Sequence, residues 1–146
     1  MRRFCKFAIL LVVMAATAAW AAPPQSAKNV PAFPGALASA RYVYVGTYEG
    51  TQFNPDVLQQ DREAVGAVQN ALRQWGKLMI VPRASEADII ILVSSRPSED
   101  TLTVYNAHQW PSGGYVWRVT GRGGLQANET PLVTQFEKAF EGAQHQ

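Results

Sequence analysis

Cysteine is nearly absent from this chain of 146 residues: the single one, Cys5, lies close to the N-terminus. One thiol cannot form an intramolecular disulfide, so the fold must be held by packing alone. A zinc site needs three or four ligands, and the two histidines, His108 and His145, are far apart in the sequence. The sequence therefore predicts no metal site and no cofactor.

Long apolar runs are also scarce, and the only prominent one, residues 7–22, follows three basic residues at the N-terminus. A charged start, an apolar centre and small residues at its end are typical of a secretory signal peptide. We expect it to span residues 1–21, with Ala18 and Ala19 as competing cleavage sites. The run is shorter than the roughly 20 residues that cross a bilayer, so we predict a periplasmic or secreted protein with no stable membrane span.

The predicted mature chain has no excess of positive charge. Without the three basic residues of the leader, the 13 basic residues fall to ten, against 11 acidic ones, and the net charge is near −1. Affinity for nucleic acid depends on clustered lysine and arginine that neutralise phosphates, and the sequence has no such cluster. Nucleic acid is therefore excluded as a partner.

Most of the remaining chain is predicted to form one domain. Residues 22–40 are rich in alanine and proline and have no periodicity, as in a linker. Residues 41–143 show regular apolar patterns and have the commonest size of a globular domain. Residues 144–146 are expected to be a short tail.

The first strand is expected at residues 41–48, because tyrosine and valine alternate there. Val43 and Val45 suit the core. The other side is a tyrosine stripe, whose exposure the sequence leaves open; it consists of Tyr42, Tyr44 and Tyr48.

A helix is predicted from Pro55 to about Trp75, ending at Gly76. Its apolar residues repeat at spacings typical of one buried stripe, and Asp61 and Glu63 are expected near the solvated face. The apolar stripe consists of Leu58, Val65, Val68, Leu72 and Trp75.

The second half of the chain predicts four strands and a helix. A strand that follows a crossover helix lies parallel to the first strand in the same sheet. The connection 82–86 is too short for a crossover, so its two flanking strands would be antiparallel if they paired directly. The expected strands are 78–81, 87–94, 102–105 and 115–120, and the last helix is 131–143.

These elements predict an α/β two-layer sandwich: a mixed sheet of about five strands with two helices, in the order β-α-β-β-β-β-α.

Few polar residues suggest chemistry. Asp88 opens an apolar strand and is either an acid/base group or a residue that binds nearby backbone amides. Together with His108 it suggests one alternative function, a small envelope hydrolase. Ser94 and Ser95 lack the glycine framing of a nucleophile elbow, and the Glu99–Asp100 pair is expected in a turn.

Aromatic residues are the better indication of a binding surface. Tyr105, Tyr115 and Trp117 are predicted to project from one face of a hairpin, with Trp110 in its loop. We expect Trp117 to be core and Trp110 to be exposed, because Trp117 alternates with a polar neighbour. The candidate binding residues are Trp110, Tyr115 and His108.

Four short runs resemble a pattern of small exported bacterial domains of unknown function. In those domains a helix ending near glycine precedes an Ala-Asp-apolar strand, a Leu-x-Val strand, an apolar-Trp-Arg strand and a last helix. The layout is also similar to the amino-terminal α/β domain of the Tol-Pal translocation protein and of envelope-assembly lipoproteins, although the acylated cysteine of the lipoproteins is missing. The runs are Ala71–Gly76, Ala87–Ile91, Leu102–Tyr105 and Val116–Arg118.

The resemblance implies a role in the cell envelope and offers no catalytic residues to carry over. We therefore predict a non-enzymatic exported binding or assembly module. Its expected partner is an envelope protein or a cell-wall component, bound at a free sheet face or edge.

Overall fold

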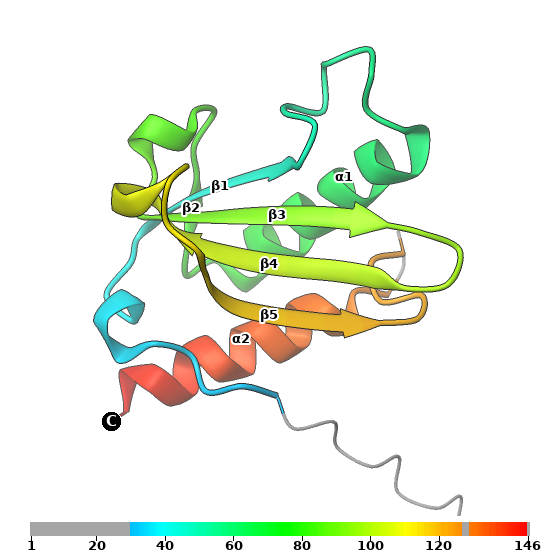
Figure 1. Ribbon diagram of the computed structural model, residues 1–146. Helices are drawn as coiled ribbons and strands as arrows, with labels where there is room; N and C mark the ends of the chain where they lie inside the picture. Colours follow the sequence, from blue (N-terminus) through cyan, green and yellow to red (C-terminus); the bar gives the residue numbers. More distant parts are fainter. Residues whose placement is uncertain (1–29, 127–128, 146) are drawn as a thin grey trace, which may run out of the picture.

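The computed structural model describes residues 30–126 and 129–145. These form a five-stranded mixed sheet and two helices, so the predicted α/β class is confirmed (Figure 1). The predicted signal peptide, 1–21, and residues 22–29 of the predicted linker lie outside the described residues. The elements are β1 (Tyr42–Thr47), α1 (Gln59–Trp75), β2 (Met79–Ile80), β3 (Ile89–Ser95), β4 (Asp100–Asn106), β5 (Tyr115–Gly121) and α2 (Pro131–Gln144).

The strands lie in the order β2-β1-β3-β4-β5. As expected from the α1 crossover, β1 is parallel to both of its neighbours, whereas β3, β4 and β5 are antiparallel to one another. β2 and β3 do not pair, because β1 lies between them: Ile80 and Ile89 are both opposite Val43. The prediction that residues 82–86 are too short for a crossover was therefore wrong: because β2 is so short, the connection to β3 has only to cross β1 and need not return along the sheet.

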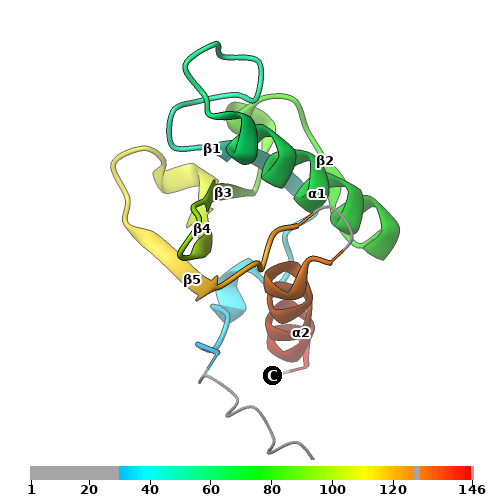
Figure 2. The same cartoon turned by 90° about the vertical axis from the view of Figure 1, so that its right-hand side faces the viewer.

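Both helices pack on the same face of the sheet (Figure 2). The predicted inner residues of α1 and α2 are buried there, apart from Leu58, which is exposed, and Trp75, which is half-buried. Neither of these helices is long and apolar enough to cross a membrane, within the described part of the chain. The sheet contributes Val43, Val45, Ile89, Ile91, Val93, Leu102, Val104, Trp117 and Val119 to this core.

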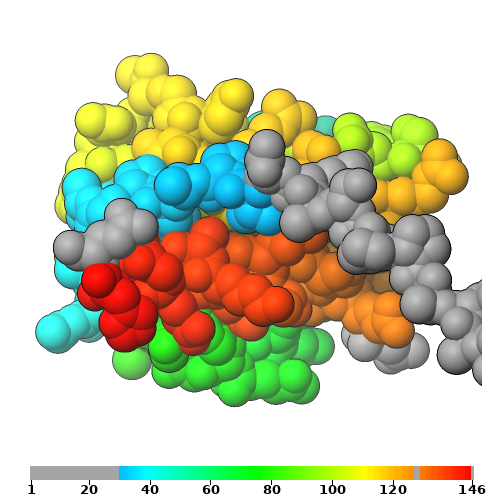
Figure 3. All heavy atoms as spheres, turned by 90° about the horizontal axis from the view of Figure 1, so that it is seen from below, coloured from blue at the N-terminus to red at the C-terminus, as the bar shows by residue number. Residues whose placement is uncertain are grey.

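The packed part of the chain begins before Arg41, inside the segment predicted as a linker. Phe33 is 4% exposed, and its ring lies 5.3 Å from that of Phe140 and 5.6 Å from that of Phe136. The indole of Trp117 donates to the carbonyl of Pro31 at 2.7 Å. Figure 3 shows this segment running beside α2. The few large apolar residues of an otherwise aperiodic stretch are therefore part of the core.

Helix α1 starts at Gln59, four residues later than predicted from Pro55. The Asn54 side chain accepts a hydrogen bond from the Asp56 amide at 3.1 Å, which holds a local turn in place of a first helical turn. Arg62 then donates to carbonyl oxygens of this loop, Val57 among them, at 3.0 and 3.1 Å. The helix ends as predicted, with Gly76 in the left-handed conformation at φ 74°.

A β-bulge separates two aromatic residues that the alternation of β5 places on one face. Val104 pairs with Trp117, but Tyr105 pairs with Tyr115, so Val116 is an extra residue. Trp117 consequently points into the core, 1% exposed, whereas Tyr115 points to the opposite face with Tyr105. The prediction that Tyr115 and Trp117 share a face was wrong for this reason, and the prediction that Trp117 is core is confirmed.

Candidate functional site

The sheet face opposite the helices is covered by aromatic side chains instead of a third layer. Two buried residues of β3, Ile90 and Leu92, lie on this face and are packed against tyrosines. The loop between β4 and β5 also folds over this side (Figure 2). We call this surface the aromatic face and define it as Tyr44, Tyr48, Tyr105, Trp110, Tyr115 and Arg118.

Two tyrosines from β1 and the residue after it lie along the sheet. A side chain at Gly46 would meet the Tyr44 ring at 2.8 Å, so the glycine allows this ring to lie flat over the backbone. The hydroxyl of Tyr48 donates to Thr103 Oγ1 at 2.7 Å, which ties the end of β1 to β4 across β3. Both rings are therefore held in place while part of their surface stays accessible.

Tyr105 and Trp110 form the centre of the aromatic face. Their ring centroids are 4.9 Å apart in an edge-to-face arrangement with an interplanar angle of 72°. Burial raises the pKa of Tyr105 to about 12, and its hydrogen-bonding interaction with Tyr48 adds to the shift. Trp110 remains 37% exposed, as predicted from the sequence.

Tyr115 and Arg118 form the accessible edge of the aromatic face on β5. Tyr115 is 57% exposed, and the guanidinium carbon of Arg118 lies 6.0 Å from its ring centroid. Among the described strand residues on this side of the sheet, Arg118 is the only charged one. A surface of tyrosine and tryptophan rings with a single arginine resembles the centre of a protein interface in composition.

The tyrosine stripe of β1, whose exposure the sequence leaves open, is partly exposed. Val43 and Val45 are in the core, while Tyr42 and Tyr48 are exposed and Tyr44 is half-buried beneath its neighbours. Alternation of the strand therefore predicted the correct faces. How much of each ring stays exposed depends on the loops that pack over the sheet.

Asp88 and His108 lie near one another at the end of the sheet where β3 begins. The Asp88 carboxylate accepts hydrogen bonds from the amides of Arg41 and Tyr42 at 2.8 and 3.0 Å. The Arg41 amide is the main cause of a lowered pKa at Asp88, and the charge of His108 lowers it further. Both side chains are at the surface and line none of the four hollows described in this structure.

This arrangement confirms one of the two interpretations of Asp88, that of a residue binding nearby backbone amides. One carboxylate oxygen, Oδ2, accepts from both amides. His108 is exposed in the short helical turn Ala107–Gln109. The hydrolase alternative stays a prediction.

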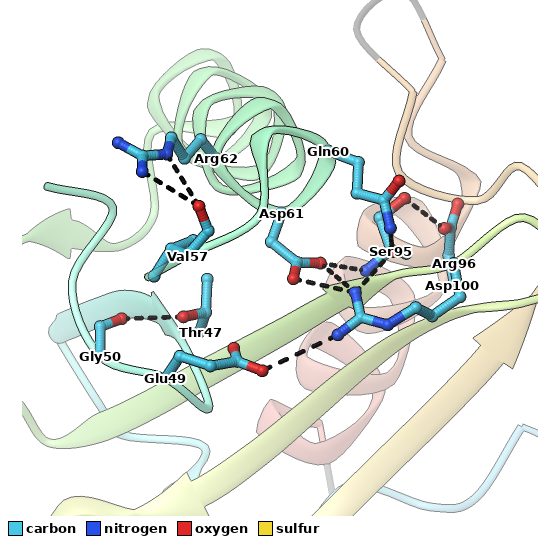
Figure 4. Close-up of polar contacts among 10 residues, drawn as sticks. All are labelled: Thr47, Glu49, Gly50, Val57, Gln60, Asp61, Arg62, Ser95, Arg96 and Asp100. Carbon is cyan, nitrogen blue, oxygen red and sulfur yellow. Dashed lines mark hydrogen bonds and ion pairs between the residues drawn. The ribbon is translucent and has the colours of Figure 1, made fainter. Parts of the chain in front are cut away.

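A second polar cluster surrounds the turn between β3 and β4 (Figure 4). Asp61 of α1 is 0% exposed; it accepts from the Ser95 amide at 2.6 Å and from Arg96 Nη1 at 2.8 and 2.9 Å. The sequence placed Asp61 near the solvated helix face, and this was wrong. Asp61 lies four residues before Val65 and therefore on the buried side of α1, whereas Leu58 precedes the helix in an extended conformation and is 50% exposed.

Asp100 is the other buried carboxylate of this cluster. It accepts from Ser95 Oγ at 2.7 Å and from the Leu125 amide at 3.0 Å. Asp100 is the first residue of β4 and is buried, so its expected place in an exposed turn was also wrong. The helical spacing of Asp61 to Val65 could have placed it on the buried side of α1. Asp100 had no such signal, because the Leu125 amide that it binds is distant in the sequence.

The described polar groups of this cluster are bonded to one another and to the backbone. Every buried side-chain nitrogen and oxygen of the described residues has a hydrogen-bond partner. Arg96 also approaches Glu49 at 3.8 Å, which links the turn to the loop after β1. The adjoining hollow, about 230 Å³, is small and open to solvent. We therefore interpret the cluster as the connection between α1 and the β3–β4 turn.

No three His, Cys, Asp or Glu side chains within residues 30–126 and 129–145 come close enough together to hold a metal ion. Protein-family models, curated proteins and solved structures offer no match to this chain, so its resemblance to envelope proteins stays a prediction.

Proposed function

We propose that this chain is an exported, non-enzymatic binding module of the bacterial cell envelope that docks a protein partner on its aromatic face. The observation that carries the proposal is the exposure of Tyr115, Trp110 and Tyr48 on a sheet face that neither α1 nor α2 covers. These rings expose large apolar areas that water does not solvate well, and burying them against a partner is favourable.

The composition of the surface favours a protein over a wall polymer. Tyrosine, tryptophan and arginine are the residues that dominate binding energy in protein interfaces, and all three occur within this one surface. The rings are held by packing and by the Tyr48 hydroxyl bond, so little side-chain freedom is lost on binding. Trp110 and Tyr115 are therefore expected to act as anchors.

Photo-crosslinking tests the location of the surface. A benzoylphenylalanine at position 115 should form a discrete adduct with one envelope protein on irradiation of intact cells. The same group at position 58 is the matched control, because Leu58 is similarly exposed but lies at the start of α1. Equal adducts from both positions, or none from position 115, would refute the location.

Binding to the purified partner then tests the energetics. Trp110→Ala and Tyr115→Ala should each raise the dissociation constant about 30-fold, which is the effect of losing an interface anchor that contributes about 2 kcal/mol. Neither change should lower the melting temperature by more than a few degrees, since both rings are partly exposed. Undiminished protein binding by both variants would overturn the proposal. If both variants instead stopped co-sedimenting with wall polymer while their protein binding was unchanged, the aromatic face would bind a wall ligand.

A further inference from the structure

The edge of β1 beside β2 is only partly paired. The β2 segment uses this edge as far as Val43, whose carbonyl accepts from the Val81 amide at 2.9 Å. The chain then turns away at Pro82, before Arg83, whose amide would be the next donor to β1 because the amides of Met79 and Val81 both point there. At the far end of β1, Thr47 exchanges two hydrogen bonds with Gly50, at 2.9 and 3.2 Å. One backbone position is left between these two closed ends.

That position is Val45. In a parallel strand, alternate residues direct their amide and carbonyl to the same side, so Val45 directs both toward the β2 edge, as Val43 and Thr47 do. Within residues 30–126 and 129–145, Val45 makes no hydrogen bond on that side. The residue is 4% exposed. A buried backbone pair without a partner costs free energy, so such a pair is normally satisfied by water or by a ligand.

A hollow of about 310 Å³ opens beside this pair of groups. Its walls come from β1, from the β2–β3 connection and from α1, and the ring of Phe53 at its rim is 82% exposed. The hollow is therefore bordered by both apolar and polar side chains, and Val45 is one of its lining residues. The lining consists of Tyr44, Val45, Thr51, Gln52, Phe53, Gln69, Arg73, Ile80, Val81 and Pro82.

The charge along this edge is positive. Arg73 of α1 lines this hollow and also the neighbouring one, of about 750 Å³, on the other side of β2. Arg41 and Lys77 line that second hollow, and no aspartate or glutamate is among the described residues lining either. Lys77 is paired with Glu141 at 2.8 Å. Among the described residues, the guanidinium of Arg73 contacts only neutral amide oxygens, those of Asn70 and Gln69.

We propose that the free edge of β1 at Val45 binds an extended acidic peptide segment of a partner protein, which continues the sheet where β2 stops. This site goes beyond the aromatic face, since it lies at the opposite edge of the sheet from β5. The peptide backbone pairs with the amide and carbonyl of Val45, an apolar side chain contacts Phe53, and a carboxylate lies near Arg73. Backbone pairing gives the orientation, and the positive edge selects the charge.

Two synthetic peptides test the proposal on the purified exported chain. The acidic probe is acetyl-Glu-Val-Glu-Val-Glu-amide, and its lysine counterpart is acetyl-Lys-Val-Lys-Val-Lys-amide. In a nitrogen-15 NMR titration, the acidic probe should give saturable shifts in which the Val45 amide is among the largest. Hydrogen exchange of that amide should slow on addition of the acidic probe. The lysine peptide should bind at least tenfold more weakly.

A pair of charge variants tests the role of Arg73. Arg73→Gln should weaken the acidic probe about threefold, as expected for one exposed ion pair, while Lys138→Gln, an exposed lysine on α2, should have no effect. Equal affinity for both peptides, equal effects of both variants, or a Val45 amide that is unmoved at saturation would each overturn the proposal. Shifts confined to Trp110 and Tyr115 would also overturn it. Because Trp110→Ala leaves the edge intact, failure here is distinguishable from failure of the aromatic face.

Discussion

Replacing Asp61 by alanine should destabilise the fold, because this carboxylate connects α1 to the β3–β4 turn. The change removes the acceptor of the Ser95 amide, whose bond to Asp61 is 2.6 Å long. A hydrogen bond to a charged group contributes about 1.5–3 kcal/mol, and losing it leaves a poorly solvated amide. The Arg96 side chain is 38% exposed, so it regains water, and its ion pair adds only about 0.2–1 kcal/mol. The total loss is therefore about 2–4 kcal/mol.

Asp61→Asn should lose less, about 1–2 kcal/mol, because the amide oxygen still accepts from Ser95 while the charge facing Arg96 is gone. Glu63→Ala is the matched control: the same helix, an exposed carboxylate, and an expected change within about 0.5 kcal/mol. Urea unfolding followed by tryptophan fluorescence measures all three, since Trp117 is buried.

The reasoning is refuted if Asp61→Ala costs under 1 kcal/mol or if Asp61→Asn is the more harmful change. A stable Asp61→Ala variant that no longer binds the partner of the aromatic face would show that the cluster takes part in binding. The free energy of unfolding of a domain is typically about 5–15 kcal/mol, so a loss of 2–4 kcal/mol leaves a measurable folded population.

Two further predictions follow from the packing of the N-terminal segment and of the aromatic face. Phe33→Ala should cost about 3–5 kcal/mol in urea unfolding, because the ring is buried among Trp117, Phe136 and Phe140; a loss below 1 kcal/mol would mean that residues 30–40 do not pack on the domain in solution. The pKa of Tyr105 is about 12 in the folded state and near 10 in the unfolded chain. The contribution of the Tyr105 hydroxyl to stability is therefore complete below about pH 10 and is lost as the pH rises toward 12. Absorbance titration at alkaline pH should show late-titrating tyrosines, because burial also raises the pKa of Tyr44. Tyr48→Phe should bring the pKa of Tyr105 partway back, because Tyr48 is one cause of its shift; an unchanged curve would contradict the contact.

Local patterns predicted the elements well where one face of each is buried against a single layer. The alternation of tyrosine and valine in β1 and the buried residues of α2 were confirmed, since period and burial coincide there. The start of α1 was missed because Asn54 and Arg62 satisfy loop carbonyls and amides that a longer helix would have used.

The candidate sites depended on contacts between residues distant in the chain. The aromatic face needs the bulge at Val116, which turns Tyr115 away from Trp117, and no alternation rule could show where one extra residue is inserted. Within the described part of the chain, the backbone of Val45 is left unpaired on the β2 side because β2 ends early, and the pairing of the strands is required to see this.

The sequence by itself determined the class of fold and the valine side of β1, because apolar periodicity decides which side of a helix or strand avoids water. Only the tertiary structure decided that Phe33 belongs to the core, that Asp61 is buried and that one backbone pair on β1 has no partner among the described residues. The physical reason is that burial and hydrogen bonding depend on which residues are neighbours in space, and a local sequence pattern does not specify neighbours that are distant in the chain.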